Sequence, residues 1–387
     1  MEQIPYGRQD ITDEDLVAVT AALRSDWLTQ GPAVPRFESA VSEYCEVAHA
    51  VAVNSATSAL HVACLAIGLG EGDWLWTSPN TFVASANCGL YCGARVDFVD
   101  IDPHTFNLSV TALAQKLEQA QGDGKLPKVV VAVHFGGQSC DMEGIFELSG
   151  RYGFRVIEDA SHAVGARYKE RPVGCCQYSD ITVFSFHPVK IVTTAEGGMA
   201  LSNNGDFAGR MRMLRAHGVT RDPSDMVGPS EGPWYYQQVA LGFNYRMTDI
   251  LAALGVSQMT RLDAYVRRRH EIAAVYDDAF RDLPVIAQSC LAGAYSALHL
   301  YVVRLRLEEL SVGRREIFDS LRAKSIGVNV HYIPVHLQPY YQKIGFGVND
   351  FPEAEKYYRE AISLPMFPKM TSTQQGVVIE ALTHALT

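Results

Sequence analysis

The feature that most constrains this chain is a regular alternation of short apolar runs with amphipathic segments of about ten residues, beginning near residue 50. The apolar runs predict strands at 50–53, 74–77, 95–99, 129–133, 155–157, 181–184 and 199–201. The segments between them predict helices at 59–69, 82–91, 109–119 and 144–152. Strands that alternate with helices form βαβ units, so we predict an α/β fold with a mostly parallel central sheet flanked by helices.

The pattern changes after about residue 247. Residues 251–280 predict one long helix, and residues 298–307 and 328–333 predict strands of a smaller α/β domain. The segment 222–233 is rich in Pro, Gly and Ser and predicts a mobile loop. A chain of 387 residues is long enough for two domains. We therefore predict an N-terminal arm (1–30), a large domain (31–250) and a small C-terminal domain (251–387).

Composition excludes several classes of partner. The chain has 33 Lys and Arg against 43 Asp and Glu, a net charge of −10, and this acidic balance argues against nucleic acid. No signal peptide is visible, and the longest apolar stretch, 59–69, is too short to span a bilayer. The cysteines are too few for a disulfide scaffold and have no zinc-site spacing. We expect a cytoplasmic protein with no metal and no membrane partner.

Two charged residues stand at predicted strand ends. Asp159 ends the strand before Ala-Ser-His-Ala, and Lys190 follows a strand 31 residues later. Ligands of open parallel sheets bind at the carboxyl ends of the strands, where both side chains would lie. A lysine amine there can form a Schiff base with an aldehyde, and a carboxylate can keep a pyridine nitrogen protonated. Alone, the lysine would be a surface residue and the aspartate a helix cap.

Three further features accompany this pair. The turn Asn54–Ala59 is made of small residues and opens a helix, so its amides and hydroxyls could hold a phosphate. Phe82 could stack on a flat ring, and Ser185 could add a phosphate contact. Each feature also has an ordinary structural explanation when taken alone. The turn could simply cap a helix, Phe82 could pack in the core, and Ser185 could be a strand serine without a function.

Together these stretches resemble a known family, the pyridoxal-phosphate-dependent nucleotide-sugar aminotransferases of fold type I. Seven ordered motifs carry the resemblance over nearly the whole chain: 31–38, 54–60, 77–82, 158–162, 184–190 with 196–198, 242–247 and 330–336. The resemblance implies a fold type I aminotransferase with a smaller C-terminal α/β domain, and pyridoxal 5′-phosphate as its cofactor.

The resemblance also implies roles for individual residues. Lys190 would carry the cofactor, and Asp159 would pair with its pyridine nitrogen. The remaining cofactor contacts would be Ala56, Thr57, Phe82, His162, Ser185 and, across a homodimer with shared active sites, Asn244 of the neighbouring subunit. His162 stands where many relatives have Gln, so its protonation state is open. Ala56 replaces a glycine that is common in the phosphate turn.

Within the family, residues 5–9, 74–80, 84–88 and 329–334 resemble the branch that serves pseudaminic acid biosynthesis. That branch moves the amino group of L-glutamate to C4 of a UDP-linked 4-keto-6-deoxy-N-acetylhexosamine. Tyr6, His331 and Tyr332 would then contact the sugar nucleotide. For His331 and Tyr332, packing within a strand of the small domain is an equally good explanation. Two alternatives remain: an aminotransferase for another nucleotide-linked ketosugar (a UDP-keto-pentose or a dTDP-4-keto-6-deoxyhexose), and a cofactor-binding module without turnover.

Overall fold

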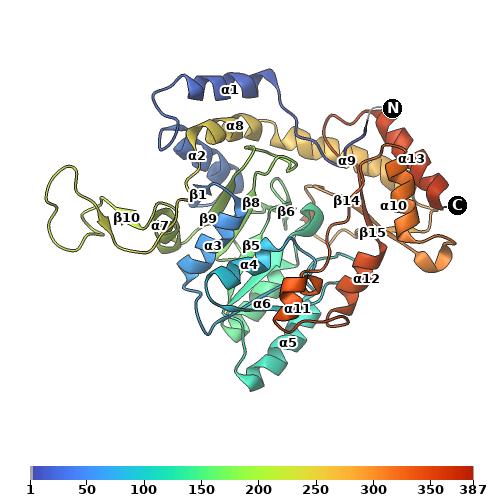
Figure 1. The fold of residues 1–387 in the computed structure, drawn as a ribbon, viewed down its shortest axis with the longest axis horizontal. Helices are drawn as coiled ribbons and strands as arrows, with labels where there is room; N and C mark the ends of the chain where they lie inside the picture. Colours follow the sequence, from blue (N-terminus) through green and yellow to red (C-terminus); the bar gives the residue numbers. More distant parts are fainter. Residues whose placement is uncertain (1–2, 387) are drawn as a thin grey trace.

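The computed structural model describes residues 3–386 and places a seven-stranded sheet at the centre of that part of the chain (Figure 1). The strand order is β1 (His49–Val53), β9 (Gly198–Ser202), β8 (Ile181–Ser185), β5 (Arg155–Asp159), β4 (Val129–Val133), β2 (Trp74–Thr77) and β3 (Arg95–Phe98). β9 runs antiparallel to both of its neighbours, β1 and β8, and the other adjacent pairs in this sheet are parallel. The predicted mostly parallel sheet is confirmed, and each predicted strand is present within two residues of its expected ends.

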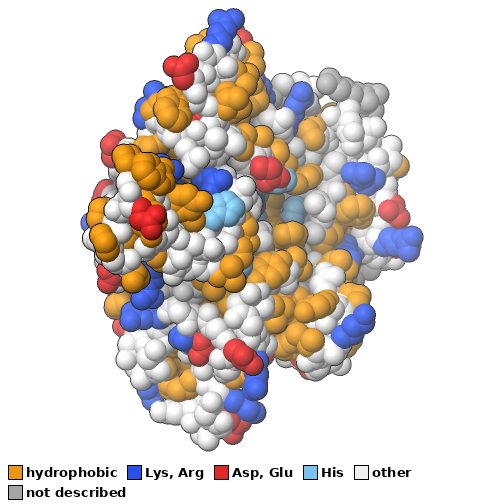
Figure 2. Space-filling model, turned by 60° about the vertical axis from the view of Figure 1, so that its left-hand side comes forward, with side chains coloured by type: hydrophobic (Ala, Val, Ile, Leu, Met, Phe, Trp, Pro, Cys, Tyr) orange, Lys and Arg blue, Asp and Glu red, His pale blue; other side chains and the backbone are white. Residues whose placement is uncertain are grey.

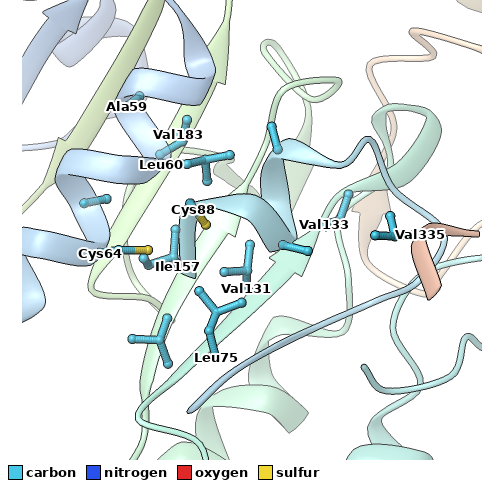
Figure 3. Close-up of a cluster of buried hydrophobic side chains, with 14 of the residues drawn as sticks. Ala59, Leu60, Cys64, Leu75, Cys88, Val131, Val133, Ile157, Val183 and Val335 are labelled. Carbon is cyan, nitrogen blue, oxygen red and sulfur yellow. The ribbon is translucent and has the colours of Figure 1, made fainter. Parts of the chain in front are cut away.

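Helices cover both faces of this sheet. One face packs under α3 (Ala56–Ile67), α4 (Ala84–Tyr91) and α7 (Gly205–Leu214), and the other under α2 (Ala33–Cys45), α5 (Val110–Asp123), α6 (Met142–Tyr152) and α8 (Asp249–Met259). Figure 3 shows the first face, where Leu60 and Cys64 of α3 and Cys88 of α4 lie over Val131 and Ile157. Because helices cover both faces of the sheet, the sequences of its strands are continuous apolar runs.

The helix starts follow from local chemistry. Ser55 caps α3, since its Oγ accepts a hydrogen bond from the Ser58 amide at 3.1 Å. Gly68 ends the same helix with a φ of +85°, a left-handed conformation that favours glycine. Ser109 caps α5 in the same way, as its place before a periodic apolar set predicts.

A second, smaller sheet is antiparallel and contains β12 (Val285–Ala287), β14 (Tyr301–Leu305) and β15 (Ala361–Leu364). It packs with α9 (Leu262–Ala279), α10 (Arg314–Ala323) and α13 (Ser372–Leu386) around a separate apolar core. The remaining elements are α1 (Asp13–Leu23), α11 (Pro339–Lys343), α12 (Pro352–Glu360), β6 (Arg167–Tyr168), β7 (Arg171–Pro172), β10 (Val219–Thr220), β11 (Gln237–Gln238), β13 (Ala294–Tyr295) and the 3₁₀ turns Phe135–Gly137, Leu307–Glu309 and Val335–Leu337.

The prediction of one helix over 251–280 is wrong. The structure has two helices, because α8 ends at Met259 and α9 begins at Leu262. At the break, the Thr260 hydroxyl donates to the Ser257 carbonyl at 2.7 Å. The Arg261 guanidinium donates to both carboxylate oxygens of Asp15 in α1, each at 2.7 Å. These local bonds need no Gly or Pro, so the sequence carries no break signal that we could use.

The predicted strand 328–333 is also wrong, and the predicted strand 298–307 is shorter than expected. Asn329 forms only an isolated bridge to Ser363, and the Tyr332 amide donates to the Asn80 side chain at 3.3 Å. The segment therefore turns towards the large sheet instead of extending the small one. Strand β14 begins only at Tyr301, after Leu298 adopts a left-handed φ of +49°.

Two segments lie apart from these layers. At the N-terminal end, Ile4 pairs with Ile326 and the Tyr6 carbonyl accepts from the Met366 amide, before α1 packs along α8 (Figure 1). Strands β10 and β11 form a hairpin that projects from the body, and the predicted loop 222–233 is its tip (Figure 1). Among residues 3–386, no helix has the length and apolar character that a bilayer span requires.

Candidate active site

A cavity of about 320 Å³ opens at the carboxyl ends of the parallel strands. Ligands of open α/β sheets bind at this edge. Ten of the eleven predicted site residues line it: Tyr6, Ala56, Thr57, Phe82, Asp159, His162, Ser185, Lys190, His331 and Tyr332. Asn244 does not, because it is exposed on the loop after β11, where its backbone carbonyl accepts from the Asn54 side chain at 3.3 Å.

Lys190 and Asp159 form the chemical centre of the cavity. No side chain or carbonyl of the described residues accepts a hydrogen bond from the Lys190 amine. Burial lowers the pKa of Lys190 to about 8, although the charge of Asp159 opposes this shift. Asp159 is held on both oxygens, since Oδ2 accepts from the Ser85 hydroxyl at 2.6 Å and Oδ1 from the Ser161 hydroxyl at 2.5 Å and amide at 3.1 Å. A nucleophilic amine thus lies near an oriented carboxylate.

The N-terminus of α3 has the features of an anion-binding site. The amides of Ala56 and Thr57 have no acceptor within the described chain, as expected in the first turn of a helix. The hydroxyls of Thr57 and Ser185 line the same cavity and have no hydrogen-bond partner there. Gly198 makes room for this turn, because a Cβ at Gly198 would lie 2.5 Å from the Ala56 nitrogen.

His162 is neutral, and the structure indicates which nitrogen carries its proton. Its Nδ1 accepts from the Gly136 amide at 3.3 Å, so Nε2 carries the proton and donates to the Tyr332 hydroxyl at 3.1 Å. Burial, followed by the charges of Lys190 and His331, holds the pKa of His162 well below its usual range. This resolves the protonation state that the sequence leaves open.

The remaining predicted residues form the walls. Both nitrogens of His331 have partners, Nδ1 with the Ser363 hydroxyl at 2.8 Å and Nε2 with the Asn329 amide at 3.3 Å. Burial and the charge of Lys190 lower the pKa of His331 to about 4. Its ring stands 5.6 Å from that of Tyr6. Phe82 is 60% exposed at the rim, so its ring face is open to a ligand.

Sequence reasoning missed Ser85, Ser161 and His299, which contact Asp159 or line the cavity. Ser161 lies two residues after Asp159, a spacing at which a serine often bonds back to an aspartate, so this contact was detectable. Ser85 comes from α4, 74 residues away along the chain. His299 precedes a strand, and a single histidine there carries no signal of its own.

The residues present fit pyridoxal 5′-phosphate. Each part of this cofactor has a partner in the cavity. The free amine of Lys190 suits the aldehyde, and the carboxylate of Asp159 suits the pyridine nitrogen. The unbonded amides and hydroxyls at the α3 N-terminus suit the phosphate, and the open face of Phe82 suits the flat ring.

Comparisons with known proteins agree with this geometry. The model of the DegT/DnrJ/EryC1/StrS aminotransferase family matches residues 9–383. The chain is 41% identical over 382 residues to the spore coat polysaccharide biosynthesis protein SpsC of Bacillus subtilis, covering 98% of this chain and 96% of SpsC. It is 37% identical over 380 residues to the UDP-4-amino-4,6-dideoxy-N-acetyl-beta-L-altrosamine transaminase of Campylobacter jejuni, with the same coverage of 98% and 96%.

Among solved structures, Helicobacter pylori PseC, an aminotransferase involved in the biosynthesis of pseudoaminic acid, superimposes with a TM-score of 0.91. The two sequences are 29% identical, and the match covers 100% of this chain and 99% of PseC. The fold type I architecture expected from the sequence is therefore confirmed.

Proposed function

The chain belongs to the DegT/DnrJ/EryC1/StrS aminotransferase family, whose members are pyridoxal-phosphate-dependent sugar aminotransferases, and on this premise we propose its substrates. The protein moves the amino group of L-glutamate to C4 of a UDP-linked 4-keto-6-deoxy-N-acetylhexosamine, in pseudaminic acid biosynthesis. The names of the Campylobacter relative and of PseC support this choice. The observation that carries the chemistry is the partnerless Lys190 amine, with a pKa of about 8, in the cavity at the strand ends.

When bound, pyridoxal phosphate supplies the electron sink that lets an amino group leave one substrate and join another. Lys190 would hold the cofactor through its amine, and that amine, when free, would move a substrate proton as a general base. Its lowered pKa keeps a useful fraction of the amine uncharged near neutral pH. Asp159 keeps the proton on the pyridine nitrogen, because an opposite charge favours the protonated form.

The other lining residues bind and orient. Ala56, Thr57 and Ser185 hold the phosphate at the α3 N-terminus, and Phe82 packs on the ring. The Nε2–H of His162, which bonds the Tyr332 hydroxyl in this structure, would turn to the phenolic oxygen of the bound cofactor. Tyr6, His331 and Tyr332 contact the sugar nucleotide from the side of the small sheet, with His331 acting through its ring edge because both its nitrogens are occupied.

We place Asn244 in the site of a second subunit. The hairpin and the segment that links it to Asn244 expose large apolar side chains, with Trp234 70% and Leu241 82% exposed. Figure 2 shows hydrophobic side chains gathered on the side of the molecule that carries this hairpin. Apolar surface of this kind is typical of an interface, so the proposal includes a homodimer with shared active sites.

A second candidate acceptor has its own support. SpsC, named for spore coat polysaccharide biosynthesis, is 41% identical to this chain, against 37% for the altrosamine transaminase. The acceptor could accordingly be another nucleotide-linked ketosugar. Purified enzyme with L-glutamate should be screened against UDP- and dTDP-linked 4-ketosugars and a UDP-keto-pentose, with the C4 configuration of each product determined. Turnover of the N-acetylated UDP sugar at least ~10-fold above the others supports the first candidate, and a preference for another sugar replaces it.

A separate experiment tests the lysine. Borohydride reduction of the cofactor-loaded enzyme followed by peptide mapping should place the pyridoxyl group on Lys190. Lys169 is a useful comparison, because it is exposed and ion-paired with Glu143. Modification of Lys169, or of any lysine other than Lys190, would remove the basis of the proposed mechanism.

A further inference from the structure

His299 lies in the cavity wall without a hydrogen-bond partner. It lies two residues before β14, is 5% exposed, and its ring centroid stands 4.5 Å from that of His162. No described residue bonds to either ring nitrogen, and Nδ1 is fully enclosed. A ligand can therefore reach the imidazole only through Nε2.

The backbone around His299 is held in place on two sides. Arg269 Nη1 donates to the carbonyls of Leu298 at 3.2 Å and His299 at 3.1 Å. On the other side, the Ala297 amide donates to the Gly137 carbonyl at 2.9 Å. Leu298 adopts a left-handed φ of +49°, which a non-glycine residue keeps only where the surroundings hold it. The imidazole is thus positioned before any ligand arrives.

Leaving a buried polar side chain unpaired costs free energy, and an aliphatic side chain would fill the same space without that cost. Burial above all, with the nearby positive charges of Lys190 and Arg269, holds the pKa of His299 well below its usual range. The ring is accordingly neutral and has one N–H to donate. Nδ1 is enclosed with no acceptor beside it, and a buried N–H without a partner is rare, so the proton is placed on Nε2, where a ligand oxygen in the cavity can accept it.

Charge indicates what kind of oxygen it is. Arg269 is 1% exposed, its Nε has no partner, and no acidic side chain of the described chain forms an ion pair with it. A buried cation without a counter-ion is costly and attracts an anion. The carboxylates lining the cavity are Asp159, already bonded to Ser85 and Ser161, and Glu196 at the exposed rim. The end of the cavity at His299 therefore favours a negatively charged ligand.

We propose that His299 binds a carboxylate of the amino donor, with Nε2–H as the hydrogen-bond donor and Arg269 as the buried charge behind it. The inference rests on the proposed aminotransferase function and extends it, because it names a group for the donor's carboxylate. Among the described residues of one subunit, no arginine lines the cavity, so that subunit does not itself supply the usual bidentate partner of a carboxylate.

The test measures binding of glutarate, an unreactive dicarboxylate, to the cofactor-loaded enzyme by calorimetry. His299→Leu should weaken binding by ~10- to 100-fold, the usual range for a lost hydrogen bond to a charged group. His299→Gln keeps a donor and should recover part of the loss. His270→Leu is the matched control, since His270 bonds the Ser296 carbonyl of the same segment but does not line the cavity. It should bind glutarate as the wild type does.

A second measurement covers the case in which His299→Leu does not fold. In wild-type enzyme with ¹⁵N-labelled imidazoles, glutarate should shift the His299 resonances, which His299→Gln identifies by their absence. Unchanged glutarate binding in folded His299→Leu would overturn the inference. A changed cofactor absorbance with normal glutarate affinity would also overturn it, by assigning His299 to the cofactor's phenolic oxygen. The proposed function fails separately, if wild-type enzyme forms no 2-oxoglutarate from glutamate with any ketosugar.

Discussion

The two walls of the cavity are built differently. The wall at the sheet edge carries Asp159, Ser185 and Lys190, each within a few residues of a strand end. The opposite wall carries His299, His331 and Tyr332, from irregular segments beside the small sheet. The first wall holds groups that can carry charge and move protons, whereas the second holds neutral rings. Under the proposed function, we expect the reaction chemistry to lie on the sheet wall and substrate recognition on the loops that face it.

The largest effect that this comparison predicts is on the sheet wall. Asp159→Asn keeps the shape of the side chain and removes the charge that favours a protonated pyridine nitrogen. We expect folded protein that transaminates at least ~10²-fold more slowly, by analogy with the loss of one positioned group in an active site. Steady-state kinetics measure this, and Ser161→Ala, which removes only one donor to Asp159, should lose less. Near-normal turnover in Asp159→Asn would show that the carboxylate is only structural.

On the opposite wall we expect a smaller effect of a different kind. Tyr332→Phe removes the hydroxyl that accepts from His162 and contacts the sugar in our proposal. The KM for the ketosugar should rise by up to ~10-fold while the reaction with glutamate is nearly unchanged, since one neutral hydrogen bond is lost. Tyr340→Phe, exposed and outside this cavity, is the control. A fall in kcat with an unchanged KM would place Tyr332 with the chemistry, and the contrast between the walls would disappear.

A third prediction concerns the open side of the cavity, where Asn244 of a partner subunit would act. Lys190→Ala and Asn244→Ala are each expected to be poorly active. In a mixed dimer one site holds both defects and the other holds neither. Random reassortment makes about half the dimers mixed, so roughly a quarter of wild-type activity should return.

The measurement is activity after co-expression, or after reversible dissociation, of the two variants. Mass spectrometry should confirm that mixed dimers form. If they do and the activity is only the average of the parents, each site is complete within one subunit.

The smallest effect is a stability difference that depends on pH. The folded pKa of Lys190, about 8, lies below its ordinary 10.5, so between these values the unfolded chain binds more protons and wild-type stability rises with pH. Cofactor-free Lys190→Met lacks this dependence. Near pH 7 it should be more stable than the wild type by about 1–2 kcal/mol, allowing for partial exposure of the amine.

Denaturant unfolding of the cofactor-free proteins at pH 7 and pH 10.5 measures this difference, which should shrink at the higher pH. Lys356→Met, at an exposed position of α12, is the control and should show no such trend. A constant difference at both pH values would mean that the amine is not buried in solution as the structure has it.

The two walls also differ in how well the sequence predicts them. Residues at strand ends were predictable, because the strand pattern and the Asp159 and Lys190 motifs are local. The opposite wall depends on contacts between distant residues, such as that of Tyr332 with Asn80, 252 positions earlier. The alternating apolar pattern of residues 328–333 is typical of a strand. In the structure, however, polar atoms of this segment bond to Asn80 and Ser363. Such partners cannot be inferred from one sequence without the fold.

The amide of Gly136 has a consequence beyond the contact itself. By donating to Nδ1, it leaves Nε2 as the donating nitrogen of the neutral His162 ring. Burial also holds the pKa of His299 well below its usual range and lowers the pKa of His331 to about 4, so the neutral form of both rings is favoured. The three buried histidines of the cavity thus resist protonation, and Lys190 is the group whose pKa burial brings down to about 8. Histidine-rich as it looks, this interior should be insensitive to mild acidification.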